Sequence, residues 1–113
     1  MKKFNFNYDL ESDDLFVYLE GKKSSGAVEL GNFVLDFDSK GDLVAIQILN
    51  ISDILNRFFS KIKEASKINE VRTEIINFRN IEGIKFKIIA DGQEETANFL
   101  IPHIKEKSPV LTH

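Results

Sequence analysis

Apolar and polar residues alternate with a period of two near the start of the chain. Phe4, Phe6 and Tyr8 are separated by polar residues, and in a second stretch Leu15, Val17 and Leu19 point one way while Phe16 and Tyr18 point the other. Successive side chains of a β-strand point to opposite faces, so this pattern is typical of strands with one buried face. The two stretches therefore predict two strands, joined by a short acidic turn.

A longer β-type segment and a hairpin follow. Residues 28–38 read as a strand with either a break or a bulge at the Gly31-Asn32 pair. The next residues, 38–42, fit a three-residue hairpin loop. In that loop Gly41 supplies the left-handed backbone conformation at low steric cost. A return strand over residues 43–49 completes the predicted hairpin.

The period then changes to that of a helix. Apolar residues recur at spacings of three and four, which predicts an amphipathic helix over residues 51–66. The apolar stripe consists of Ile51, Ile54, Leu55, Phe58, Phe59, Ile62 and Ala65. Ser52 is the predicted N-cap. Both Phe58 and Phe59 are expected to lie in the core.

Three further strands are predicted, at about residues 70–80, 84–90 and 94–101, with turn sequences at hairpin spacing between them. Pro102 ends the last strand, and the tail over residues 102–113 is expected to be poorly anchored. The fold class that follows is α+β: an antiparallel, mostly meandering sheet of six or seven strands with one helix packed on it. We expect a single domain over residues 1–113.

Composition excludes several classes of function. There is no Cys, so thiol catalysis and cysteine-ligated zinc are excluded. The net charge is −3, and nothing resembles the basic stripe that nucleic-acid binding needs. No apolar run approaches the roughly 20 residues of a membrane helix, and no signal peptide is recognisable, so a cytoplasmic protein is expected. No cofactor-binding motif is present, and no cofactor is predicted.

Four carboxylates are candidates for chemistry: Glu11, Asp13, Asp36 and Asp38. Clustered carboxylates can act in acid–base catalysis or bind a hard cation. The segment that begins at Asp36 partly resembles a calcium loop, but Lys40 occupies a ligand position. An Asp beside a turn more often bonds backbone amides. We therefore expect no catalytic and no metal site, and interpret these acids as structural.

Surplus apolar residues indicate an interaction surface. Residues 43–49 are apolar on both faces, which predicts a strand covered on both sides. Phe16 and Tyr18 point away from the face that carries Leu15 and Val17. One helix can cover one face of a sheet only. Either a second copy or a protein partner covers the other face, or the C-terminal meander folds over it.

Two blocks of residues resemble a known family. The first block contains Tyr8, Asp9, Glu11, Asp13, Leu15 and Leu19, and the second contains Asp36, Asp38, Gly41, Ile46, Ile48, Leu49 and Ser52. This pattern resembles DUF2283, a small prokaryotic family of domains of unknown function, over residues 4–52. Ala45 and Gln47 stand where the family favours Gly and Glu. The helix and the last three strands, about residues 53–101, then form an extension of the family-like part.

The predicted function is that of a non-catalytic protein-interaction or oligomerisation module. Its expected partner is a second copy, as a homodimer, or another small protein. Some members of the family are encoded beside a small toxin, so the resemblance implies an antitoxin-like role as an alternative. A cation-binding protein or an acid–base enzyme that uses the four carboxylates is the third hypothesis.

Overall fold

Eight strands and two short helical segments make up the part of the chain that the computed structural model describes, residues 1–78 and 81–100. The strands are β1 (Lys2–Asp9), β2 (Asp14–Tyr18), β3 (Gly26–Leu30), β4 (Phe33–Phe37), β5 (Leu43–Ile48), β6 (Ile68–Phe78), β7 (Ile81–Ala90) and β8 (Gln93–Leu100). The helical segments are α1 (Ile51–Phe58) and the 3-10 turn η1 (Ala65–Lys67). The class is α+β, as predicted, but the sheet has eight strands where six or seven were predicted.

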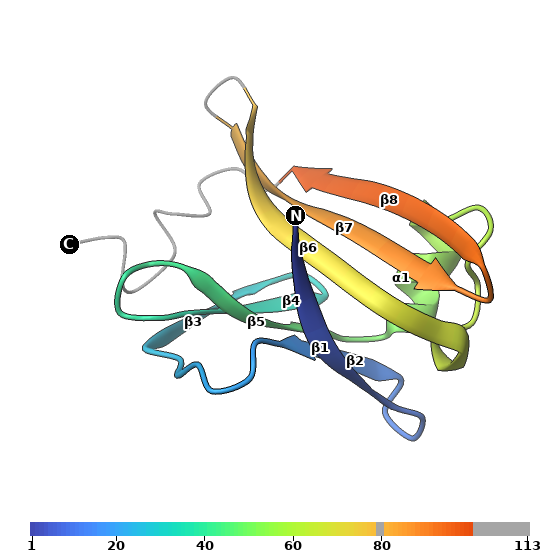
Figure 1. Cartoon of the computed structure of the whole chain (residues 1–113), viewed down its shortest axis with the longest axis horizontal. Coiled ribbons are helices and arrows are strands. Elements are labelled where there is room, and N and C mark those ends of the chain that lie inside the picture. Colours follow the sequence, from blue (N-terminus) through green and yellow to red (C-terminus); the bar gives the residue numbers. More distant parts are fainter. Residues whose placement is uncertain (79–80, 101–113) are drawn as a thin grey trace.

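The strands form one antiparallel sheet in the order β3-β4-β5-β2-β1-β6-β7-β8. The sheet curls, so that β6–β8 lie over β1–β5, and α1 closes one end of the space between them (Figure 1). Strand β1 joins the two layers, because Lys2 to Phe4 pair with β6 and Asn5 to Asp9 pair with β2. The inner faces of the two layers meet, as the rings of Phe33 on β4 and Phe86 on β7 show by stacking 6.0 Å apart.

The extra strand arises at the Gly31-Asn32 pair, where a break or a bulge was predicted. Leu30 pairs directly with Phe33, so Gly31 and Asn32 form a two-residue hairpin loop that reverses the chain. Gly31 has φ 59°, which a type II′ turn requires at its first loop position and which glycine adopts without strain. The Asn32 side-chain amide donates to the Leu49 carbonyl oxygen at 2.8 Å and fixes the turn against β5.

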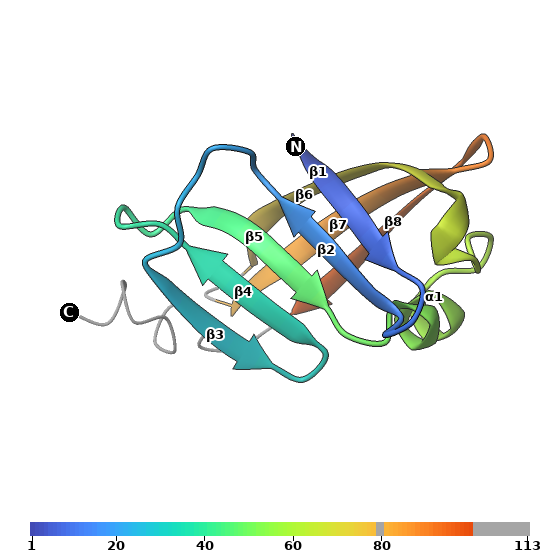
Figure 2. The ribbon, with the colours of Figure 1, turned by 90° about the horizontal axis from the view of Figure 1, so that it is seen from below.

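Alternation along the strands separates a buried inner face from an open outer face. On β5, Val44, Ile46 and Ile48 are buried, whereas the alternate residues are half-buried. The prediction that this strand is covered on both sides is therefore wrong. The C-terminal meander packs on the inner face, and nothing in residues 1–78 or 81–100 covers the outer face of β1–β5 (Figure 2).

The start of α1 is fixed by a carboxylate from a distant turn. Asn50, with φ 54°, is the N-cap and makes no capping hydrogen bond through its side chain, so the prediction of Ser52 as N-cap is wrong. Instead, the Ser52 N–H and hydroxyl both donate to the Asp13 carboxylate, at 3.1 and 2.7 Å. A negative charge at this position also complements the positive end of the helix dipole.

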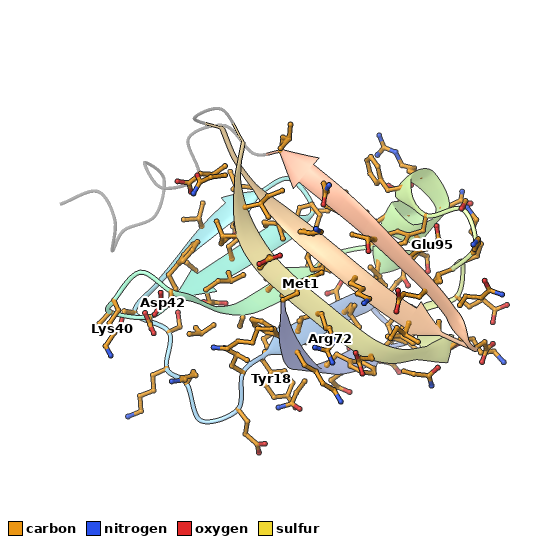
Figure 3. All side chains as sticks on the ribbon, turned by 45° about the horizontal axis from the view of Figure 1, so that its top comes forward. Met1, Tyr18, Lys40, Asp42, Arg72 and Glu95 are labelled. Carbon is orange, nitrogen blue, oxygen red and sulfur yellow. The ribbon has the colours of Figure 1, made fainter. Side chains whose placement is uncertain are left out.

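The helix ends at Phe58, eight residues earlier than predicted. A continued helix would pair the N–H groups of Ser60, Lys61 and Ile62 with carbonyl oxygens one turn back. These three groups donate instead to the carboxylate of Glu95 on β8, with 2.9 Å for Ser60 and 2.7 Å for Ile62. Glu95 lies on the side of β8 that faces the segment after α1 (Figure 3). Charged acceptors make stronger hydrogen bonds than neutral carbonyls.

The apolar stripe of the predicted helix is buried all the same, with one exception. Phe59 is extended and 3% exposed, and Ile62 and Ala65 also lie in the core. Phe58 is 49% exposed and contacts Phe99 edge-on, with the ring centroids 5.0 Å apart. The expectation that Phe58 lies in the core is therefore wrong.

The three C-terminal strands form the predicted meander. Within the described ranges, no helix is both long and apolar enough to cross a membrane. The tail predicted over residues 102–113 lies outside the described residues.

We predict that the two adjacent phenylalanines differ in their contribution to stability. Phe59→Ala should lower the free energy of unfolding by about 3–5 kcal/mol, because a buried ring is lost. Phe58→Ala should lower it by only about 1 kcal/mol, the usual contribution of an edge-on aromatic pair at the surface. Urea denaturation of both variants measures the difference. Equal losses of unfolding free energy would contradict the exposed position of Phe58.

A second prediction concerns acid stability. Burial alone would raise the pKa of Glu95, but the hydrogen bonds from Ser60, Ile62 and Lys61 lower it from 4.5 to about 2. The ionised carboxylate therefore stabilises the fold above pH 4.5, and this contribution is lost as the pH falls toward 2.

The variant Glu95→Gln tests this effect. It should lower the free energy of unfolding at neutral pH by about 1–3 kcal/mol, and it should lose less stability than the wild type on acidification. Glu94→Gln is the matched control, since Glu94 makes only a surface ion pair with Lys87 at 3.3 Å. Identical acid profiles for the two variants would refute the prediction.

Candidate functional site

The four candidate carboxylates do not form one cluster. Glu11 and Asp13 lie in the turn between β1 and β2, which is next to the end of β5 at Ile48. Asp36 and Asp38 lie at the opposite end of β5, beside Leu43. Among the described residues, no group of three or more Asp, Glu, His or Cys side chains is arranged to hold a metal ion.

Asp13 holds the β1–β2 turn and the start of α1 together. Its carboxylate accepts hydrogen bonds from the Tyr8 hydroxyl at 2.6 Å and from Ser52, and its carbonyl oxygen accepts the Ile51 N–H at 2.8 Å. Burial opposes ionisation of this group, but the hydrogen bonds from Tyr8 and Ser52 leave its pKa lowered. The same contact with Asp13 raises the pKa of Tyr8. Glu11 is exposed.

The other two candidates hold a hairpin and a loop. The Asp38 carboxylate accepts the backbone N–H groups of Lys40 and Asp42, both at 2.9 Å, and Gly41 has φ 84° as predicted. These bonds, first of all the one from Asp42, lower the pKa of Asp38. Asp36 accepts the Ser24 hydroxyl at 2.8 Å. Asp13, Asp36 and Asp38 thus all serve as acceptors within the fold.

The outer face of β1–β5 carries an open patch of mixed character, which we call the outer patch. Two rows of aligned residues form it: Asn7, Phe16, Gln47, Val34 and Glu29 in one row, and Asn5, Tyr18, Ala45, Asp36 and Ala27 in the other. Phe16 is 43% exposed, and its ring lies 6.2 Å from that of Tyr18. The patch therefore has an aromatic centre on β2 and carboxylates toward the edge strand β3.

A cavity of about 550 Å³ opens at the end of the sheet opposite α1, between the β4–β5 hairpin and the first residues of β1. We call it the end cavity. Buried residues that line it are Phe4, Phe37, Val44 and Thr73, and the residues nearer its mouth include Lys2, Lys22, Asp42, Glu74 and Glu82. Asp42 lies on the hairpin, far from Glu95 (Figure 3). This volume lies within the range of small-molecule sites.

Thr73 is the unusual residue of this cavity. It is 1% exposed, and its hydroxyl makes no hydrogen bond within the described structure. A buried hydroxyl without a partner costs about 1–3 kcal/mol. The apolar isostere Val would avoid this cost, so the fold alone does not explain a threonine at this position.

A weak signal for the end cavity was present in the sequence. Inward positions of β6 and β7 are apolar in the core, as at Val71 and Ile84, but become polar at the open end. The polar residues are Thr73, Asn77 and Glu82, and Lys2 occupies the equivalent place on β1. Polar residues on an otherwise apolar inner face often mark functional sites. The sequence alone does not show that these strand ends come together.

The comparisons with known proteins concern the first half of the chain. Residues 5–52 match the family model described as "Protein of unknown function (DUF2283)". These residues comprise most of β1, all of β2–β5 and the contact of Asp13 with Ser52. No solved structure matches the chain.

Two curated relatives share similarity with the chain over about half its length. An uncharacterized protein of Methanocaldococcus jannaschii is 46% identical over 54 residues, which are 48% of this chain and 47% of the relative. A protein of Methanosarcina mazei, named provisionally as a hypoxanthine phosphoribosyltransferase, is 33% identical over 51 residues, or 45% of this chain and 42% of the relative. The chain thus spans less than half the length of either relative, and its segment 5–52 is the part that matches the DUF2283 family model.

Proposed function

We infer that this chain is a non-catalytic interaction module that binds a protein partner through the outer patch. The exposed Phe16 and the half-buried Tyr18 beside it, on a sheet face that nothing in the described structure covers (Figure 2), carry this inference. Aromatic residues at the centre of a patch, surrounded by polar residues, are the usual anchors of protein interfaces.

The charge of the patch favours a basic partner over a second copy. Asp14, Glu29 and Asp36 lie on or beside the outer patch, and residues 1–50 carry five lysines and nine acidic residues. Two copies that met through this face would bring these carboxylates together, which is unfavourable. A partner with an apolar centre and a basic rim complements the patch. An antitoxin-like role requires the same kind of surface.

The carboxylates support a role without catalysis. Three of the four candidates already accept hydrogen bonds from the protein itself, so they are poorly placed to act on a substrate. The enzyme name of the Methanosarcina relative applies to a protein of which the match covers 42%. No step of its chemistry is carried over to this chain.

We predict that Phe16→Ser abolishes binding to the partner without unfolding the module. The wild type and the variant are used as baits in an extract of the source cells, and the protein retained by the wild type alone is then purified. Its affinity is measured directly and should fall as salt is raised, because the complementary charges are screened. Phe58→Ser is the matched control, since Phe58 is exposed to a similar extent on a different surface.

Light scattering over a concentration series distinguishes the two possible occupants of the patch, a different protein and a second copy of this chain. The proposal expects a monomer for the wild type. A stable dimer that Phe16→Ser converts to a monomer would show that a second copy covers the patch. Equal partner binding by the wild type and Phe16→Ser would refute the proposed surface.

We also predict that the candidate carboxylates stabilise the fold and bind no cation. Asp13→Asn should lower the free energy of unfolding by about 1–2 kcal/mol, because Asn tolerates the φ of 59° but loses the charge that holds Ser52. Glu11→Gln is the control and should change stability by less than about 0.5 kcal/mol.

The same samples test the cation hypothesis. Millimolar calcium, magnesium or manganese should leave the wild-type Tm unchanged, because any ion bound selectively by the folded state would raise it. A rise in Tm that Asp13→Asn removes would contradict the structural role.

A further inference from the structure

We propose that the end cavity binds a small molecule that combines a flat apolar ring with a protonated amine. The site is separate from the outer patch, because its lining comes from inward positions and from the mouth of the sheet rather than from the outer face of β2. It also draws on both parts of the chain. Phe4, Phe37 and Val44 belong to the family segment or its edge, and Thr73 belongs to the C-terminal meander.

The floor of the cavity suits an apolar ring. Phe4, Phe37 and Val44 line the cavity but are almost completely buried. Leu19, Leu43 and Ile75 also line it and are only half-buried, so they leave apolar surface open to a ligand. Such a surface gains most from a ligand that excludes water over a large area, and a flat ring does so with little loss of conformational freedom.

Thr73 supplies the polar contact at the same depth. Thr73 lines the cavity, and its buried hydroxyl has no hydrogen-bond partner in the described structure. A ligand with a polar atom beside its ring would satisfy this hydroxyl. Such a contact gives selectivity, since a buried polar group that stays unpaired disfavours ligands without a matching atom.

The charges around the mouth determine the sign of the ligand. Two lysines, Lys2 and Lys22, line the cavity together with four acidic residues, Asp38, Asp42, Glu74 and Glu82. Lys22 is close enough to Asp38 to favour its charged form. The remaining lining is therefore acidic in balance, which attracts a cation and disfavours phosphorylated molecules. Long-range attraction of this kind weakens with salt.

Three probes separate the contributions of ring and charge. Tryptamine carries an indole ring and an ammonium group, indole-3-propanoate carries the same ring with a carboxylate, and butylamine carries the charge without the ring. Each is titrated at millimolar concentration and constant ionic strength while the backbone amide resonances are followed by NMR. Tryptamine should shift the amides of Phe4, Val44 and Thr73 in a saturable manner, and the other two probes should bind at least roughly tenfold more weakly.

The variant Thr73→Val tests the buried hydroxyl with two independent readouts. It should raise the Tm, because an unpaired polar atom is replaced by an isosteric methyl group, and it should weaken tryptamine binding by roughly tenfold. Thr96→Val is the matched control, since Thr96 is exposed on β8 and does not line the cavity. It should leave the affinity unchanged.

Each other outcome overturns part or all of the proposal. Preferred binding of indole-3-propanoate would refute the cationic ligand, and equal binding of butylamine would refute the role of the ring. If no probe shifts the three amides, the cavity holds only solvent. A Thr73→Val variant that loses stability and keeps its affinity would show that the hydroxyl serves the fold. Phe16→Ser should bind tryptamine normally, so a failure here is distinct from a failure of the partner proposal.

Discussion

The whole arrangement depends on the divided pairing of β1. This strand gives its first residues to β6 and the remainder to β2, so two groups of strands that are separate in sequence become one continuous sheet. Backbone hydrogen bonds on both sides of a single strand fix the angle between the layers, and side chains such as Leu15 and Val71 then fill the space between them. Where β1 begins, the layers are no longer filled by apolar side chains, and the end cavity opens.

Much of the fold could be predicted from local patterns. The period of two located the strands, and the glycine at position 41 located a hairpin, because both depend on residues that are neighbours in sequence. The length of α1 could not be predicted in this way. Its apolar stripe continues to Ala65, but the carboxylate of Glu95 arrives from a strand more than thirty residues later and takes the N–H groups that would extend the helix. A tertiary partner overrides the local period here.

The candidate site shows the same division between local and distant information. The bonds of Asp38 join groups that are close in sequence and are those expected of an Asp beside a turn, whereas the contact of Asp13 with Ser52 bridges 39 residues. The end cavity was missed because its lining is gathered from five strands and two loops. The polar residues at inward positions, Thr73 among them, hinted at it, but polar residues in a strand are also common at exposed positions.

The contact between Asp13 and Ser52 has a consequence for how such chains are assembled. Ser52 is also the last residue of the segment that matches the family. The matching segment therefore ends where the Asp13 carboxylate, which belongs to the same segment, fixes the start of α1. The segment nevertheless has an apolar inner face, with Val17, Leu35 and Ile46 fully shielded only because the later strands lie over it. A polypeptide made of this segment alone would be half of a layered structure. It would have to obtain its second layer by association, whereas this chain carries that layer covalently and leaves its other face available for a partner.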